Sequence, residues 1–264
     1  MVKKLFKHEF LAWLRIMAIV WVVMLTVAAA NRVYQLFENA SNAYMVVFVL
    51  GIVAFVLTLT VCMSICEIFG VVRFYKNLFT GEGYLSFTLP VSTSAHIWVK
   101  ALTFAAMMLL TLLVAGLSVL IVCSNEVMVE VYKAAAYLLA KLPAEARGHL
   151  TGYGIEMIVL LLTGCVFGPM LFYACICIGQ LFRKHRVLGA IGVYFGYYYI
   201  CQIFTSVLSF SLSFLEIEWL EKLETFPFGL FHGILCGLIV WNVLAGTVYF
   251  LICRHITTKK LNLE

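Results

Sequence analysis

The chain of 264 residues contains no aspartate and few charged residues of any kind. Charged side chains make up 12% of the sequence and hydrophobic ones 64%, with a mean hydropathy of +1.04. An average soluble domain is about 25% charged and about 45–50% apolar. A soluble fold of this size could not cover so much apolar surface. The composition therefore predicts a single membrane domain over residues 1–264 and excludes enzymes that need an aspartyl nucleophile.

Motifs for nucleotide binding and for metalloprotease chemistry are also missing. The sequence has no G-x-x-x-x-G-K-[ST] and no G-x-G-x-x-G, because Gly81-Glu82-Gly83 lacks the third glycine of the latter motif and has Ser86 in its place. His8-Glu9 lacks the second histidine of H-E-x-x-H. We therefore predict no catalytic residue, metal ligand or bound cofactor in this chain. A lone late histidine, His232, is expected to be a hydrogen-bonded packing residue.

Cysteine and proline give little sign of special chemistry. None of the nine cysteines forms C-x-x-C, and nearly all lie in apolar runs, as small buried hydrophobic residues do. Of the four prolines, Pro169 is expected to kink a helix because it removes a backbone donor.

What the sequence does have is six long apolar runs. Each reaches the roughly 20 residues that a helix needs to cross a hydrocarbon core about 30 Å thick. Only helices and closed barrels satisfy their backbone polar groups in lipid, and these runs are too long and uniform for barrel strands. We therefore predict an all-α integral membrane fold of six transmembrane helices. The spans are expected at about 16–36, 44–69, 97–123, 153–181, 187–213 and 228–253.

Lysine and arginine concentrate on one side of these predicted spans. Because positive charge accumulates in cytoplasmic loops, this side is expected to be cytoplasmic, with both termini on it. The richer side holds Lys3, Lys4, Lys7, Arg15, Arg73, Lys76, Lys100, Arg183, Lys184, Arg186, Arg254, Lys259 and Lys260. The other side holds Arg32, Lys133, Lys141, Arg147 and Lys222. We read the net charge of +5 as orientation charge, not as a nucleic-acid-binding surface.

Three segments beside the spans are amphipathic. The basic, aromatic N-terminus KKLFKHEFLAWLRIM is typical of an interfacial helix, or alternatively of a plain extension of the first span. Segments 125–142 and 213–226 carry charges between apolar residues and are expected to be short outer helices. Buried charge is scarce, and Glu67 is expected to pair with Arg73 or with another basic residue near the same side.

The fifth run carries polar side chains at helical spacing. Such a stripe either lines a wet path or joins helices by hydrogen bonds, and both remain open. Its members are Tyr198, Gln202, Thr205, Ser206, Ser209 and Ser213. Pairs of glycines four residues apart, such as Gly192 and Gly196, are further signs of close helix packing.

The segment RFYKNLFTGEGYLSFTLPVS, from Arg73 to Ser92, lies between the second and third runs. Residues 71–80 are predicted to form one short helix that Gly81 ends. Phe74, Leu78 and Leu85 are apolar although the topology assigns them to water. Exposed aromatic residues indicate a docking surface, unless they lie against the membrane interface.

That segment resembles the first cytoplasmic loop of ABC-2 type transporter permeases, and the ending RHITTKKLNLE is similar to endings in the same group. The resemblance covers essentially the whole chain. It implies a compact six-helix exporter fold with an N-terminal elbow helix, in the cytoplasmic membrane of a bacterium. It also implies pairing with a second permease copy, identical or paralogous, and with ATP-binding subunits encoded separately. Those subunits would bind ATP and Mg²⁺.

The resemblance also implies roles for particular residues. A coupling helix that seats on the ATPase maps to Arg73, Phe74, Tyr75, Lys76, Asn77, Leu78 and Phe79, with Glu82 beside it. An outer gate maps to about 213–226, including Phe214, Trp219 and Leu220. The expected cargo is an amphipathic peptide, a drug or another hydrophobic compound. The alternatives are a stand-alone secondary carrier or channel and, less favoured, an intramembrane enzyme.

Overall fold

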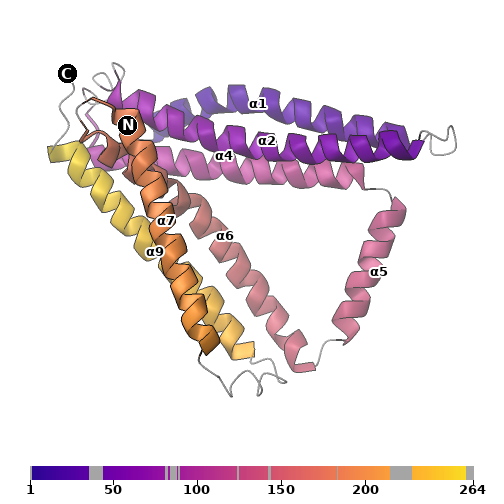
Figure 1. The fold of residues 1–264 in the computed structure, drawn as a ribbon. Coiled ribbons are helices and arrows are strands. Elements are labelled where there is room, and N and C mark those ends of the chain that lie inside the picture. The colour runs from indigo at the N-terminus through magenta and orange to yellow at the C-terminus, as the bar shows by residue number, and fades with distance from the viewer. Residues whose placement is uncertain are drawn as a thin grey trace. The chain divides into compact units, whose positions relative to one another are not determined.

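A computed structural model describes residues 2–35, 44–80, 83, 88, 90–123, 125–141, 144–182, 184–214 and 228–259. The elements assigned in these ranges are all helices (Figure 1). They are α1 (Val2–Gln35), α2 (Tyr44–Phe79), α4 (Thr93–Val122), α5 (Asn125–Lys141), α6 (Ala144–Gly179), α7 (Arg186–Phe214) and α9 (Phe228–Lys259).

Six of these helices are long and apolar enough to cross a membrane, namely all except α5. This confirms the predicted all-helical fold and indicates a multi-pass membrane protein. Several helices extend beyond the apolar runs that predicted them. The 36 residues of α2 span about 54 Å at 1.5 Å per residue, well over the roughly 30 Å of a hydrocarbon core. The ends of such a helix must therefore lie outside the hydrocarbon layer.

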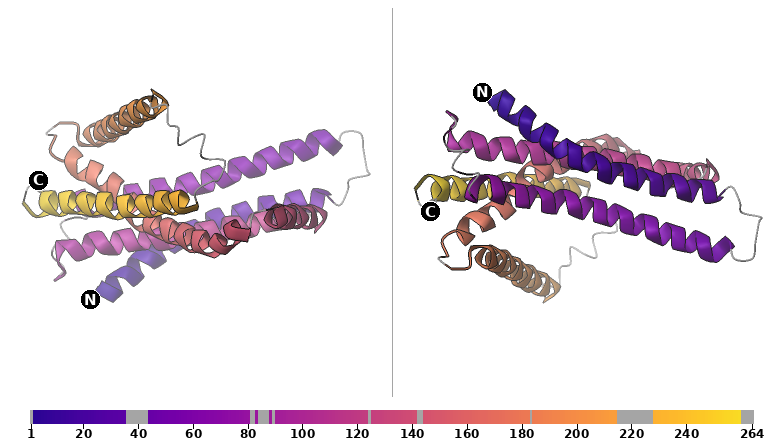
Figure 2. Two further views of the ribbon diagram at one scale, coloured as in Figure 1. Left: turned by 90° about the horizontal axis from the view of Figure 1, so that it is seen from below. Right: turned by 90° about the horizontal axis from the view of Figure 1, so that it is seen from above.

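The chain divides into two compact units. The first comprises Met1–Phe74 and Trp98–Arg147, and the second comprises Tyr75–Ile97 and Gly148–Glu264. In the first unit α1, α2 and α4 lie side by side (Figure 2). Contacts between α1 and α4 join residues separated by 91, 90 and 87 positions, as expected for two parallel helices. Glu9 contacts Arg73 near one end of α2, and Asn31 lies against Gly51 near the other, so α2 is antiparallel to α1.

Aromatic rings fill the core between these three helices. Trp13 of α1 is 2% exposed, and its ring centroid lies 5.6 Å from those of both Phe69 and Phe104. Gly70 makes this packing possible, because a Cβ there would overlap the rings of Phe104 and Trp13. About two turns further along α1, the indole Nε1–H of Trp21 donates a hydrogen bond to Thr111 Oγ1 at 3.1 Å. A glycine on α2 thus lets three helices meet around one buried indole.

In the second unit, α6 and α9 run parallel. His149 meets His232, Phe167 lies against Gly246, and Cys177 meets Thr257. Because the separation along the sequence stays near 80 from one end to the other, the two helices keep one register (Figures 1 and 2). Helix α7 packs on both, through a stack of Phe172 with Tyr194 and a bond from Tyr249 to Tyr197.

Some sequence-based expectations differ from the structure. Val2 to Gln35 form one uninterrupted helix, so a separate elbow is not confirmed and the plain-extension alternative describes α1. Likewise, the predicted short helix 71–80 is the continuation of α2, which ends at Phe79. Segment 125–142 is helical as predicted, and every described side chain of α5 from Met128 to Lys141 is exposed. Residues 215–227, where outer helices were expected, lie outside the described residues.

Candidate functional site

The proposed coupling segment forms the last two turns of α2. Phe74, Leu78 and Phe79 are only 1%, 0% and 7% exposed, whereas Lys76 is exposed. The expectation that Phe74 and Leu78 face water is therefore wrong, and Leu85 lies outside the described residues. Because the helix does not end at residue 69, Phe74 and Leu78 stay on one helical face and continue the apolar side of α2. Arg73, Tyr75 and Asn77 are half-buried, and Glu82 lies outside the described residues.

At the same level, one carboxylate joins the three helices of the first unit. Glu9 Oε2 of α1 accepts a bond from Arg73 Nε of α2 at 2.6 Å, and Glu9 Oε1 accepts one from Lys100 Nζ of α4 at 3.0 Å. The Glu9 and Lys100 side chains are 12% and 7% exposed. Charge-assisted bonds of this kind are shorter and stronger than neutral ones. Glu9 therefore ties α1 to both α2 and α4.

This cluster was not predicted. Arg73 pairs with Glu9 and not with Glu67, which is exposed and forms no ion pair within the described ranges. One signal in the sequence could have revealed it, because Glu9 is the single acid in a strongly basic N-terminal segment. The second signal, an antiparallel register between the first two spans, is not readable from composition.

The side chains of the polar stripe on α7 are exposed in the described structure. Tyr198 is 53% exposed, and Gln202, Thr205, Ser206 and Ser209 are exposed as well. Tyr197, on another face, differs: its hydroxyl accepts a 2.6 Å bond from Tyr249. The stripe therefore does not join α7 to the described helices of its own chain. The Ser213 and Phe214 side chains, together with Trp219 and Leu220, lie outside what the structure describes.

The glycine pairs of the late spans are equally open. A Cβ at Gly164, Gly168, Gly192, Gly196, Gly233 or Gly237 would meet nothing within 4 Å. The close packing that these pairs predict is therefore not found between described helices of one chain. They leave small, smooth surfaces on α6, α7 and α9.

A second polar cluster lies where α6 and α9 begin. His232 Nδ1 lies 2.6 Å from Glu156 Oε1, and His232 Nε2 lies 3.1 Å from His149 Nδ1. The Tyr153 ring stacks on His232 with centroids 4.2 Å apart. Gly152 lets the histidine approach, since a Cβ there would stand 3.0 Å from His232 Cε1. This confirms the prediction that His232 is a hydrogen-bonded packing residue.

The cluster can hold a proton in more than one place. When His232 is neutral, its Nδ1–H donates to Glu156 and its Nε2 accepts from His149 Nδ1–H. When His232 is protonated, Nε2–H donates to His149 instead, so the bond between the two imidazoles reverses. Glu156 and His232 are 20% and 25% exposed, and His149 is exposed, so the chain of groups leads from the surface inwards.

The contact between Glu156 and His232 was not predicted from the sequence. Their contact depends on the register of α6 against α9, two helices that are not neighbours in the sequence. Among the described residues, no group of three or more His, Cys or Glu side chains is arranged to hold a metal ion.

No family model, curated protein or solved structure matches the chain significantly.

Proposed function

We propose that this chain is the membrane subunit of an ATP-driven exporter of the ABC-2 type, which works with separately encoded ATP-binding subunits. The observation that carries the proposal is the polar stripe of α7. Gln202, Thr205, Ser206 and Ser209 are exposed on a helix long and apolar enough to cross a membrane, and of these Thr205 already donates its hydroxyl to the Cys201 carbonyl at 2.8 Å. Each polar group that stays unsatisfied in hydrocarbon costs roughly several kcal/mol of free energy. Protein or water must therefore cover this face.

A second copy of the chain would supply that cover. In a two-fold pair the same face meets itself, so a stripe of donors and acceptors is self-complementary. Small residues let such helices approach closely, and the open glycines Gly192 and Gly196 lie on the same helix. In this proposal the two stripes enclose a path for an amphipathic peptide, a drug or another hydrophobic compound, and segment 213–226 gates it on the outer side.

The end of α2 would receive the ATPase. Lys76 offers an exposed charge there, and Tyr75 and Asn77 are half-buried beside it. Because Arg73 is bonded to Glu9, and Glu9 to Lys100, a force on this end of α2 acts on α1 and α4 as well. ATP binding can shift the conformation of these three helices only if the ATPase, with nucleotide bound, has a higher affinity for one of their two conformations than for the other. In this arrangement both termini lie in the bacterial cytoplasm, where Glu82 would add to the docking contact.

The test is co-purification followed by transport. The chain would be expressed together with a candidate ATP-binding subunit from the same genome and isolated through a tag on the chain itself. The proposal expects a stable complex whose ATP hydrolysis is stimulated by cargo in proteoliposomes. A chain that transports alone, with no ATPase bound and no need of ATP, would overturn it.

A proton-coupled carrier is the second candidate, and one observation favours it. The Glu156–His232–His149 cluster connects an exposed imidazole to a partly buried carboxylate. Carriers of this class use such ionisable chains. Uptake into vesicles driven by a pH gradient without ATP, and lost in Glu156→Gln, would favour the carrier. ATP-dependent transport that Glu156→Gln leaves intact would favour the exporter.

A further inference from the structure

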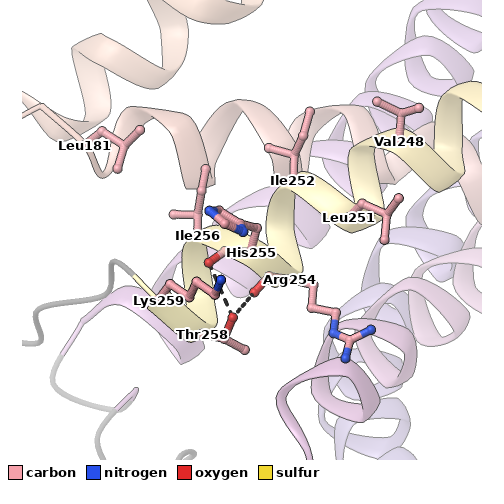
Figure 3. Close-up of a pocket in the computed structure, with 9 residues that line it drawn as sticks. All are labelled: Leu181, Val248, Leu251, Ile252, Arg254, His255, Ile256, Thr258 and Lys259. Atoms are coloured by element: carbon pink, nitrogen blue, oxygen red, sulfur yellow. Dashed lines mark hydrogen bonds between the residues drawn. The ribbon is translucent and has the colours of Figure 1, made fainter.

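An open groove of about 710 Å³ lies along the last three turns of α9 (Figure 3). All of its lining residues except Leu181, which follows α6, come from that one helix. The lining consists of Leu181, Val248, Leu251, Ile252, Arg254, His255, Ile256, Thr258 and Lys259. The groove includes part of the RHITTKK segment, which the proposed transport role does not use.

The groove lining changes from apolar to basic side chains along α9. Val248, Leu251 and Ile252 form an apolar stretch nearer the middle of α9, and the basic side chains lie towards its end (Figure 3). From residue 248 to residue 259 the helix rises about 16 Å. An acyl chain beneath a charged headgroup has this order and roughly this depth at the edge of a bilayer.

The basic side chains are available to a ligand. Arg254, His255 and Lys259 are exposed, and none of them forms an ion pair with any residue that the structure describes. None of the described residues that line the groove is acidic. Thr258 Oγ1 donates to the backbone carbonyls of Arg254 at 2.7 Å and of His255 at 3.3 Å, so its hydroxyl proton is engaged within α9. The local charge is therefore positive and lacks a counter-charge in the described chain.

From this geometry we infer that the groove binds an anionic membrane phospholipid. The phosphate lies between Arg254 and Lys259, which can donate charge-assisted bonds to its oxygens. One acyl chain lies against Val248 and Leu251. Basic pockets beside membrane helices bind anionic headgroups by the same combination of contacts. A free phosphate would use the charges alone and leave the apolar wall uncovered. The inference needs only a membrane-embedded chain and does not depend on the transport proposal.

The test is lipid binding measured by native mass spectrometry on the purified full chain. Phosphatidylglycerol, phosphatidylcholine and inorganic phosphate would be titrated separately. The double variant Arg254→Gln/Lys259→Gln should bind phosphatidylglycerol at least about tenfold more weakly, since each surface cation contributes several-fold to such binding. Its matched control is Lys3→Gln/Lys4→Gln, which removes the same charge from exposed positions on α1 and should bind as the unmodified chain does.

A variant of the apolar wall separates lipid from free anion. Leu251→Asn keeps every cation, so it should weaken phosphatidylglycerol binding several-fold and leave the response to inorganic phosphate unchanged. If both double variants lost phosphatidylglycerol affinity equally, the inference would be overturned. The binding would then reflect only the general attraction of a positive chain for an anionic lipid. It would equally be overturned if inorganic phosphate displaced phosphatidylglycerol at comparable concentration, or if the Arg254→Gln/Lys259→Gln chain bound phosphatidylglycerol normally.

Discussion

Glu9 Oε2 and Arg73 Nε lie 2.6 Å apart although 64 positions separate the two residues in the sequence. The same carboxylate also bonds Lys100, so one acidic residue is shared by two cations from two other helices. In a region of low dielectric constant, removing the acid takes a nearby counter-charge from both cations. Glu9 also links the end of α2, where the proposed coupling segment begins, to α1 and α4.

Glu9→Gln should therefore destabilise the chain by roughly 2–3 kcal/mol, somewhat less than for a fully buried pair because Arg73 retains some exposure. Unfolding in mixed detergent micelles, followed by circular dichroism, would measure this. The matched control is Glu67→Gln on α2. Glu67 is exposed and without an ion pair in the described structure, so its loss should change stability by less than about 0.5 kcal/mol. Equal effects would contradict the assigned role of Glu9.

Substitutions at Phe79 and Lys76 should distinguish a loss of stability from a loss of coupling to the ATPase. Phe79 is 7% exposed, so Phe79→Ala should cost roughly 3 kcal/mol of stability through the cavity it leaves. Lys76 is exposed, and Lys76→Ala should leave stability unchanged while it weakens the proposed contact with an ATPase subunit. Stability would be followed by thermal unfolding, and coupling by cargo-stimulated ATP hydrolysis of the complex. Full stimulation in Lys76→Ala would remove that residue from the docking contact.

Gly70 and Gly116 form a matched pair for packing. A Cβ at Gly70 would overlap Phe104 and Trp13, so Gly70→Ala should destabilise the chain by about 1–3 kcal/mol. At Gly116 a Cβ meets nothing within 4 Å, and Gly116→Ala should be neutral or gain up to about 1 kcal/mol from helix propensity. Unfolding midpoints would be measured for both variants, and only that of Gly70→Ala should fall. A neutral Gly70→Ala would mean that α2 does not approach α1 and α4 as described.

The α7 stripe can be tested at Gln202. Gln202→Leu removes the amide and should leave folding intact, because this side chain is exposed and makes no described bond within the chain. Transport into inverted membrane vesicles should nevertheless fall. The control is Ile203→Leu, an exposed apolar neighbour on the same helix, which should transport normally. Normal transport by Gln202→Leu would leave the stripe with a role outside the transport cycle.

Much of the fold could be predicted because membrane spans are set by composition alone. The six long apolar runs correspond to six helices that are long enough to cross a membrane. One of these helices, α6, continues through Pro169. The polar contacts could not be predicted in the same way. Glu9 with Arg73 and Glu156 with His232 are joined by helix register, which depends on packing between elements distant in sequence. The continuous α2 also shows why Phe74 was misplaced, since an amphipathic face does not stop where hydropathy falls.

The constant register of α6 against α9 has a mechanical consequence. Three contacts, at His232, Gly246 and Thr257, fix the two helices along about 40 Å at 1.5 Å per residue. A slip of α6 against α9 by one helical turn would break all three contacts together. A small force should therefore rotate or tilt the two helices as one rigid pair. A proton added beside Glu156 at one end and a lipid seated beside Arg254 at the other would then act on the same moving part.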